Sequence, residues 1–431
     1  MDQEATESEQ RFAAYVEQLA KVMGHADRKR PLNDYCTGLV MPLERKSVEP
    51  LAAVTSPGHA CAQHQSLLHF VGASPWSDEA VLAEVGAMVL PSMKRQGPIE
   101  AWIIDDTATP KKGKHSVGVA HQYCGQLGKQ ANCQASVSLS LANHQASLPV
   151  AWRLYLPREW TKDHERCTKV GIPRETRFKT KPQIAFEQVR AAYDAGLPQA
   201  PVLMDCGYGK DTGLRRRFTE LGLTYVAAIL PQTKLWAQAR RQPYSAEKLA
   251  LSLPAQAWKE VQWREGTGQR RSSRFARMRV RAAHRKALPA ADPRSEEWLL
   301  IEWPKREKKP TKYSLTTLPK DIAFARMVDT SKLRWRIERD YEELKQEVGL
   351  GHFEGRGWRG FHHHATLCIA TYGFLVSEKG TIPPSGPYSC GPSQTPSLSQ
   401  GGRSKIAASA TPTSHAEFDC YSSMPSHLGA R

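Results

Sequence analysis

The stretch "IEAWIIDDT" (Ile99–Thr107) is a short apolar run that ends in acid, which is typical of a buried strand. The stretches "HSVGVAHQYCG" and "ANCQASVSLSLANHQ" that follow place small and β-branched residues in strand-like alternation. "KPQIAFEQVRAAYDAG" indicates a helix that ends at Gly196, and "APVLMDCGYG" is a second apolar run ending in acid. A helix candidate, "KDTGLRRRFTELG", and another buried strand, "TYVAAILP", complete a segment that predicts a mixed α/β fold with one sheet.

Residues 1–97 differ from this segment, because their apolar residues recur at helical spacing. "EQRFAAYVEQLAKVM" and "SDEAVLAEVGAMVL" show that spacing, and Ser77 is placed to cap the second helix. The linker between them, "HADRKRPLNDY", is basic. A small helical domain with basic patches is suited to DNA binding, so we expect an N-terminal helical DNA-binding domain here.

Residues 233–325 interrupt the α/β pattern. Within them Arg277, Arg279 and Arg281 alternate with apolar residues, so on a strand the arginines would share one face. We expect an inserted, mainly β domain with a basic strand; a solvated strand face in an ordinary insertion is the alternative. Residues 379–431 are rich in Pro, Ser and Gly and lack apolar periodicity, which predicts a disordered tail.

The charge of the whole chain is its most unusual property. The 431 residues carry a net charge of +17, which favours a polyanionic partner, nucleic acid before an acidic membrane surface. No run approaches the ~20 apolar residues of a membrane span, and the acidic N-terminus is unlike a secretory signal. Nine scattered cysteines without a CxxC pair indicate a reducing cytosol, with neither a disulfide framework nor a zinc site. "FHHHATLC" (Phe361–Cys368) fits a helix start with polar histidines better than a metal site.

The stretch "RWRIERDYEELK" (Arg334–Lys345) is densely charged and still has helical periodicity. At 100° per residue, one apolar stripe is made of Ile337, Tyr341, Leu344 and Val348. Arg334, Glu338 and Lys345 form a narrow row beside that stripe, so we expect the Glu338 carboxylate to be partly desolvated. The other charges are expected to face water: Arg336, Arg339, Asp340, Glu343 and Glu347. The alternative is a helix with internal ion pairs, such as Arg334–Glu338 at i,i+4.

Two aspartates share a sequence context with each other. Asp105 and Asp205 each follow four mostly apolar residues, "AWII" and "PVLM". Carboxylates at strand ends of a buried sheet emerge outside the packed zone, where Glu338 from a covering helix would complete an acidic pocket. Three unpaired carboxylates repel one another, and Mg²⁺ removes that repulsion because it takes oxygen ligands. Two such ions promote phosphoryl transfer. A strongly basic protein that favours a polyanionic partner and has this pocket is therefore expected to cut or join DNA.

These residues together resemble the DDE transposases of bacterial insertion sequences, in the group whose last motif is Tyr-x2-Arg-x3-Glu-x6-Lys. Arg334, Glu338 and Lys345 match that spacing, and Ser331 stands where the motif has tyrosine. Three further stretches resemble the family: "DDTATPKKGKHSVGVAHQYCGQLGKQANCQ" at the first aspartate, "MDCGYG" at the second, and "GHFEGRGWRGFHHHATLCIATYGFL" after the glutamate. The resemblance covers roughly residues 30–378.

The resemblance implies a ribonuclease-H-like catalytic core made of residues 98–232 and 326–378, with the insertion between them. It implies Mg²⁺-dependent cleavage at element ends, with Mn²⁺ as a substitute, and strand transfer into double-stranded target DNA. Two element ends imply a homodimer in the active complex, and we expect a bacterial cytoplasmic protein associated with the nucleoid. The alternatives are a catalytically silent relative that occupies element ends and blocks transposition, and a nuclease without a joining step.

By motif, the resemblance assigns catalysis and metal binding to Asp105, Asp205 and Glu338. Asp106 is a competitor for the first position, and only one of the two neighbours can point into the site because a strand alternates faces. The pattern Asp-x-Thr, ending at Thr107, favours Asp105.

DNA contacts are predicted for five cations. Arg334 and Lys345 are expected to bind DNA phosphates beside the metal site. Lys111, Lys112 and Lys114 follow the first strand and could do the same, or form a solvated loop. A tryptophan of the insertion could stack on an unpaired base, although a core position is the more ordinary role for tryptophan.

Overall fold

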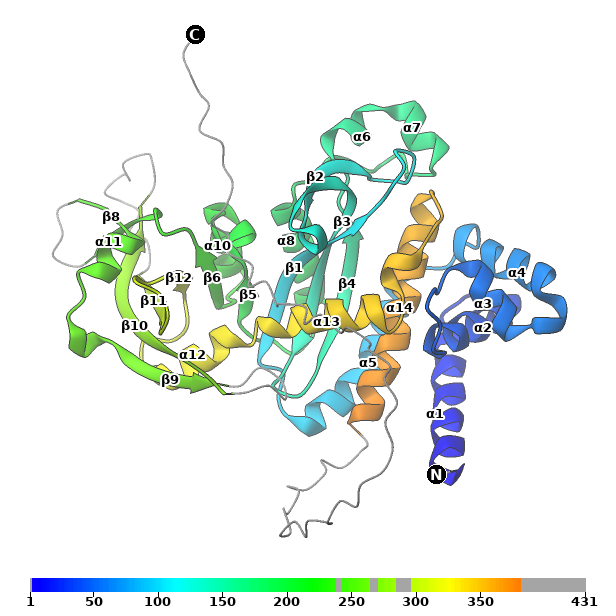
Figure 1. Cartoon of the computed structure of the whole chain (residues 1–431), viewed down its shortest axis with the longest axis horizontal. Helices are drawn as coiled ribbons and strands as arrows, with labels where there is room; N and C mark the ends of the chain where they lie inside the picture. Colours follow the sequence, from blue (N-terminus) through cyan, green and yellow to red (C-terminus); the bar gives the residue numbers. More distant parts are fainter. Residues whose placement is uncertain (1, 238–241, 264–269, 284–295, 381–431) are drawn as a thin grey trace, which may run out of the picture. The chain divides into compact units, whose positions relative to one another are not determined.

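The computed structural model describes residues 2–237, 242–263, 270–283 and 296–380 (Figure 1). The predicted disordered tail lies outside the described residues from residue 381 onward. Helices and strands alternate through the middle of the chain, so the predicted α/β class is confirmed. No helix within the described ranges is both long and apolar enough to cross a bilayer.

One mixed sheet contains the twelve strands of the described residues. At its centre, β1 (Ala101–Pro110) pairs antiparallel with β3 (Lys129–Ala142) and parallel with β5 (Val202–Met204). Both β2 (Ala120–Cys124) and β4 (Ser147–Leu154) pair with the other edge of β3, and β6 (Tyr225–Ile229) runs parallel to β5. Antiparallel strands on one side of β1 and parallel strands on the other are the predicted ribonuclease-H-like arrangement, which is confirmed.

The two faces of β1 belong to two hydrophobic cores. Trp102 and Ile104 pack with α8 (Lys181–Asp194) and α10 (Thr212–Glu220). Ala101 and Ile103 face the other way, toward α12 (Phe324–Lys332) and α13 (Trp335–Gln346). The predicted apolar stripe of the densely charged helix is buried along α13, which crosses the sheet next to β1 and β4 (Figure 1). Alternation along a single strand therefore decides which side chains can meet α13.

The helical character predicted for residues 1–97 is confirmed. The five α-helices of this described segment are α1 (Asp2–Ala20), α2 (Lys29–Val40), α3 (Val48–Thr55), α4 (Ala60–Gly72) and α5 (Asp78–Gln96). Ser77 caps α5 as predicted, accepting a hydrogen bond from the Ala80 N–H at 3.1 Å. Four of them, α1, α2, α4 and α5, pack against α14 (Trp358–Lys379), and all five share its core with one face of the sheet. The buried Lys46 ammonium adds a polar link, since it donates to the carbonyls of Leu39 in α2 and Glu347 after α13.

The insertion is mainly β, as predicted, and continues the central sheet. Its described elements are β7 (Lys234–Ala237), β8 (Tyr244–Ser245), α11 (Ala246–Leu251), β9 (Lys259–Trp263), β10 (Arg271–Ala282), β11 (Glu297–Pro304) and β12 (Lys312–Thr316). β12 pairs antiparallel with β6, which joins the insertion to the core by main-chain hydrogen bonds. On β10, Arg277 and Arg279 share a face as predicted, and both guanidinium groups lie over the Trp298 ring at 4.4 and 4.8 Å. These two arginines are therefore partly packed instead of forming a freely solvated face.

Candidate active site

Asp105 and Asp205 are neighbours because β1 and β5 are in parallel register. Ile104 of β1 pairs with Met204 of β5, so the next residue of each strand is an aspartate. Asp205 also caps the short helix α9 (Cys206–Gly209), where its Oδ1 accepts a hydrogen bond from the Tyr208 N–H at 3.2 Å. The two apolar runs that end in acid thus bring two carboxyl groups to one edge of the sheet.

Burial is the main electrostatic influence on both carboxyl groups. It raises the pKa of Asp105 to about 8 and also raises the pKa of Asp205. The Arg334 guanidinium opposes both pKa shifts, whereas nearby carboxylates reinforce them. Two desolvated carboxyl groups side by side favour a further positive charge next to them, because such a charge would offset both the burial and their mutual repulsion.

Arg334 joins the aspartate pair to α13. Its Nη1 lies 3.2 Å from Asp105 Oδ2, and its Nη2 donates to Glu338 Oε1 at 2.7 Å. The expectation that Glu338 is partly desolvated is wrong, because 64% of its side chain is exposed. The Arg334 guanidinium lies between the carboxylates of Asp105 and Glu338, and it holds Glu338 away from the buried pair of Asp105 and Asp205. The alternative reading of the sequence, an i,i+4 ion pair, is observed as well.

Asp105 and Asp106 point to opposite faces of β1. Asp106 shares the face of Trp102 and Ile104, where its Oδ2 accepts from Lys181 Nζ at 2.5 Å and its Oδ1 from the Tyr208 hydroxyl at 3.0 Å. Asp105 instead shares the face of α13 and reaches Arg334. Since Asp106 is already neutralised by a lysine on the far face, the geometry favours Asp105 as the first carboxylate of the site.

The predicted DNA-binding lysines fall into two groups. Lys345 Nζ donates to the Ala108 carbonyl at 3.2 Å, and Lys111 Nζ to the Phe353 carbonyl at 2.7 Å. Burial lowers the pKa of both ammonium groups. Lys112 and Lys114 are exposed on the loop after β1. The ammonium groups of Lys112 and Lys114 form no hydrogen bond within the described residues, so both can approach a phosphate without giving one up there.

The expectation that Asp340 faces water is wrong. Asp340 is fully buried on the inner side of α13, where its Oδ1 accepts hydrogen bonds from the Ser147 and Tyr372 hydroxyls. Burial raises the pKa of Asp340 to about 6. The helical-wheel estimate failed because α14 and β4 enclose α13 on this side too, and a wheel drawn for one helix carries no information about a second covering layer.

The oxygen ligands that Asp105, Asp205 and Glu338 provide fit a divalent cation. Asp105, Asp205 and Glu338 offer carboxylate oxygens, the hard ligands that Mg²⁺ and Mn²⁺ prefer. Burial raises the pKa of both aspartates, so a cation bound beside them would stabilise their ionised forms. An exposed third carboxylate at Glu338 leaves the site open toward solvent and substrate.

Divalent-metal affinity is expected to rise with pH up to about 8 and then level off. The raised pKa of Asp105 means that this group is mainly protonated below about 8, and a bound cation must displace the proton. Affinity should therefore increase by up to about tenfold per pH unit between pH 6 and 8. Mn²⁺ titration by calorimetry in two buffers of different ionisation enthalpy measures both the affinity and the proton release. Asp105→Asn should flatten the profile, and a pH-independent affinity in the unaltered protein would contradict the argument.

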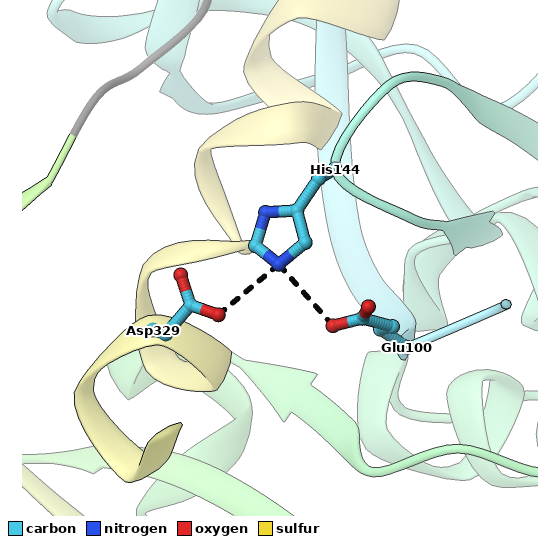
Figure 2. Close-up of side chains that lie close together, drawn as sticks. All are labelled: Glu100, His144 and Asp329. Atoms are coloured by element: carbon cyan, nitrogen blue, oxygen red, sulfur yellow. Dashed lines mark ion pairs between the residues drawn. The ribbon is translucent and has the colours of Figure 1, made fainter. Parts of the chain in front are cut away.

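A second cluster, which the sequence did not indicate, lies where α12 meets the start of β1. His144 Nε2 lies 3.2 Å from Glu100 Oε2 and 3.1 Å from Asp329 Oδ2, as Figure 2 shows. The three ligand atoms lie within 4.8 Å of one another, a spacing that could hold a metal ion. The Arg326 guanidinium, however, already pairs with Glu100 at 2.7 Å and with Asp329 at 3.1 Å. The cluster thus contains its own cation and fits a polar link between α12 and the sheet.

The histidines of "FHHHATLC" are structural. His362, His363 and His364 are buried in the first turns of α14 and bond to main-chain groups, and His363 stacks on Trp76 with 3.5 Å between ring centroids. Burial lowers their pKa values to about 4, 3 and 4, so the imidazoles are neutral at pH 7. The expectation of a helix start is confirmed, and the three histidines lie in the protein core.

Comparisons with known proteins agree with this geometry. Residues 18–270 match the family described as DDE superfamily endonuclease, and residues 185–374 match the transposase DDE domain. A probable transposase for insertion sequence element IS701 from Microchaete diplosiphon is 28% identical over 193 residues. That alignment covers 44% of this chain and 46% of the relative, so the chain spans about half the length of the relative it matches. The second family match is a similarity over less than half of the chain. The first family match extends over more than half of the chain and includes both strand-end aspartates: the chain belongs to the DDE superfamily of endonucleases.

Proposed function

We propose that this protein is a DNA transposase that cuts insertion-sequence ends and joins them to target DNA. The observation that carries the proposal is the pair of desolvated carboxyl groups, Asp105 and Asp205, aligned by parallel strands and linked through Arg334 to Glu338. These three carboxylates would hold two divalent ions, Mg²⁺ with Mn²⁺ as a substitute. When bound, such ions activate the attacking oxygen and stabilise the leaving oxygen in phosphoryl transfer.

The protein's own side chains would orient the ligands and the DNA phosphate. Main-chain pairing fixes Asp105 and the cap of α9 fixes Asp205, so both carboxylates are oriented in advance. Glu338 is exposed, so its carboxylate would be free to turn and complete the oxygen ligands of a divalent ion held by the two aspartates. Arg334 lies among the carboxylates as a fixed positive charge, where it would orient a phosphate of the DNA strand being cut.

The substrate we propose is double-stranded DNA, both as element end and as target. The net charge of +17 supports a polyanionic partner, and the matched relative is described as a transposase for an insertion sequence. Joining two ends in one event supports a homodimer as the active form. A silent relative that only occupies element ends is less well supported, because Asp105, Asp205 and Glu338 are all present.

Glu338→Gln is expected to lower the rate of cutting and joining by about 10²-fold while DNA binding is kept. Glutamine keeps the size of the exposed side chain but removes a charged oxygen ligand. A labelled element-end duplex with Mg²⁺ separates bound, cut and joined products on one gel. Glu342→Gln, a neighbouring exposed change on α13, is the control and should cut normally. Equal cutting by the Glu338→Gln variant would remove that residue from the site, and binding without cutting by the unaltered protein would favour the silent relative.

A further inference from the structure

A strongly basic surface is formed by two segments that the proposed mechanism does not use. We call residues 111–119 and 155–181 together the basic platform. The two segments contain eleven Lys or Arg and four Asp or Glu, so they carry +7 of the chain's net charge of +17 in 36 of its 431 residues. Positive charge is therefore concentrated here beyond the average of a basic protein.

Packing and hydrogen bonds hold the two segments of the basic platform together. It contains α6 (Arg158–Lys162) and α7 (His164–Lys169), which lie beside β2 in Figure 1. Trp160 is fully buried beneath them and donates from Nε1 to the Val119 carbonyl at 2.8 Å. Arg166 lies 3.5 Å from the Trp160 ring, and its Nη2 donates to the Lys114 carbonyl at 2.7 Å. A small satellite core thus fixes the loop after β1 against α7.

The outward cations of the basic platform are not neutralised. Lys112, Lys114, Lys169 and Arg174 are exposed, and none of them forms an ion pair with a carboxylate in the described part of the chain. Two exposed arginines of helices elsewhere on the surface are paired, in contrast: Arg190 with Asp194 at 2.8 Å and Arg216 with Glu220 at 3.1 Å. The field of a cation without a carboxylate partner remains available to an external anion, whereas the field of a paired cation is partly cancelled.

The basic platform adjoins β1, the strand that carries Asp105 on one face and Asp106 on the other. Its first segment continues directly from β1, six residues after Asp105, and its second segment ends at Lys181, whose ammonium pairs with Asp106. We propose that the basic platform binds the phosphate backbone of duplex DNA that flanks the cut, through Lys112, Lys114, Lys169 and Arg174. The inference rests on the proposed function and adds to it a surface that holds the flanking duplex without reading its sequence.

Salt dependence of DNA affinity tests the proposal directly. Each phosphate contact that is lost should reduce the slope of log K against log salt by about 0.9. Lys114→Gln with Lys169→Gln should therefore reduce the magnitude of the slope by about 1.8, and adding Lys112→Gln and Arg174→Gln by about 3.6. The affinity should fall equally for element-end and unrelated duplexes, measured by fluorescence anisotropy in EDTA between 50 and 300 mM salt, where no cutting occurs.

Matched variants separate charge from structure. Arg190→Gln with Arg216→Gln removes two exposed but paired cations and should leave the slope unchanged, and Lys114→Arg with Lys169→Arg should preserve it. Melting temperatures check that every variant is folded. If the salt-dependence slope of the fourfold variant stays within 0.5 of that of the unaltered protein, the proposed role of the basic platform is overturned. The transposase proposal would remain intact. Absence of duplex binding by the unaltered protein would instead overturn the proposed function.

Discussion

Asp105→Asn is expected to slow cutting of an element end by about 10³-fold, whereas Asp106→Asn should leave cutting within about tenfold. Loss of one metal ligand removes several kcal/mol of transition-state stabilisation, and 1.36 kcal/mol corresponds to a factor of ten. Asp106 lies on the opposite face of β1 and pairs with Lys181 and Tyr208, so its loss should affect folding more than chemistry. The two variants differ by one position in the chain and by the side of the sheet that they alter.

Single-turnover cutting with saturating protein measures this contrast without interference from DNA affinity. Asp105→Asn should also weaken Mn²⁺ binding, while Asp106→Asn should bind Mn²⁺ normally and melt at a lower temperature, because Lys181 loses its half-buried partner. The reverse order of rates would assign the first carboxylate to Asp106. Similar losses in both variants would mean that strand alternation does not decide the ligand.

Asp340→Asn is expected to stabilise the protein by about 3 kcal/mol at pH 8. Burial raises the folded-state pKa of Asp340 from 3.8 to about 6, and two pKa units correspond to roughly that free energy. The sign follows from linkage: a raised folded pKa means that stability is complete below pH 4 and is lost as the pH rises toward 6. Asparagine does not ionise, so the variant avoids this loss, and the gain should be about half as large at pH 5.

Urea unfolding of both proteins at pH 5 and pH 8 measures the predicted difference. The amide oxygen can still accept from the Ser147 and Tyr372 hydroxyls, and the amide N–H can donate to the neighbouring Ser140 hydroxyl. Glu342→Gln removes a carboxylate from the exposed side of α13 and is the control for the change of net charge. Destabilisation at pH 8 would mean that the hydrogen bonds to the carboxylate outweigh the cost of burying its charge.

Sequence periodicity was sufficient to predict the helices and strands around the candidate active site and part of the site itself. Two apolar runs predicted β1 and β5, and the positions directly after Ile104 and Met204 identified the aspartate pair. The apolar stripe of α13 was correct because it depends only on helical geometry within one segment. Local patterns therefore predict what a segment presents to its neighbours.

The remaining features depend on contacts between distant segments. Nothing near Asp340 in the chain indicates that α14 covers it, and Arg334 rather than Glu338 fills the space beside Asp105. The link of His144 with Glu100 and Asp329 joins three segments, and the basic platform joins two. One sequence without long-range contacts contains no signal from which such partners can be chosen.

The pairing of β12 with β6 has a consequence for attempts to make a minimal catalytic domain. If the insertion were excised, β6 would become an edge strand with a row of unpaired N–H and C=O groups and apolar neighbours. Such an edge is a template for strand pairing between molecules, so the shortened protein should aggregate even though its carboxylates were untouched. Residues 312–316, which form β12, act as a protective border of the core and belong in any truncated version.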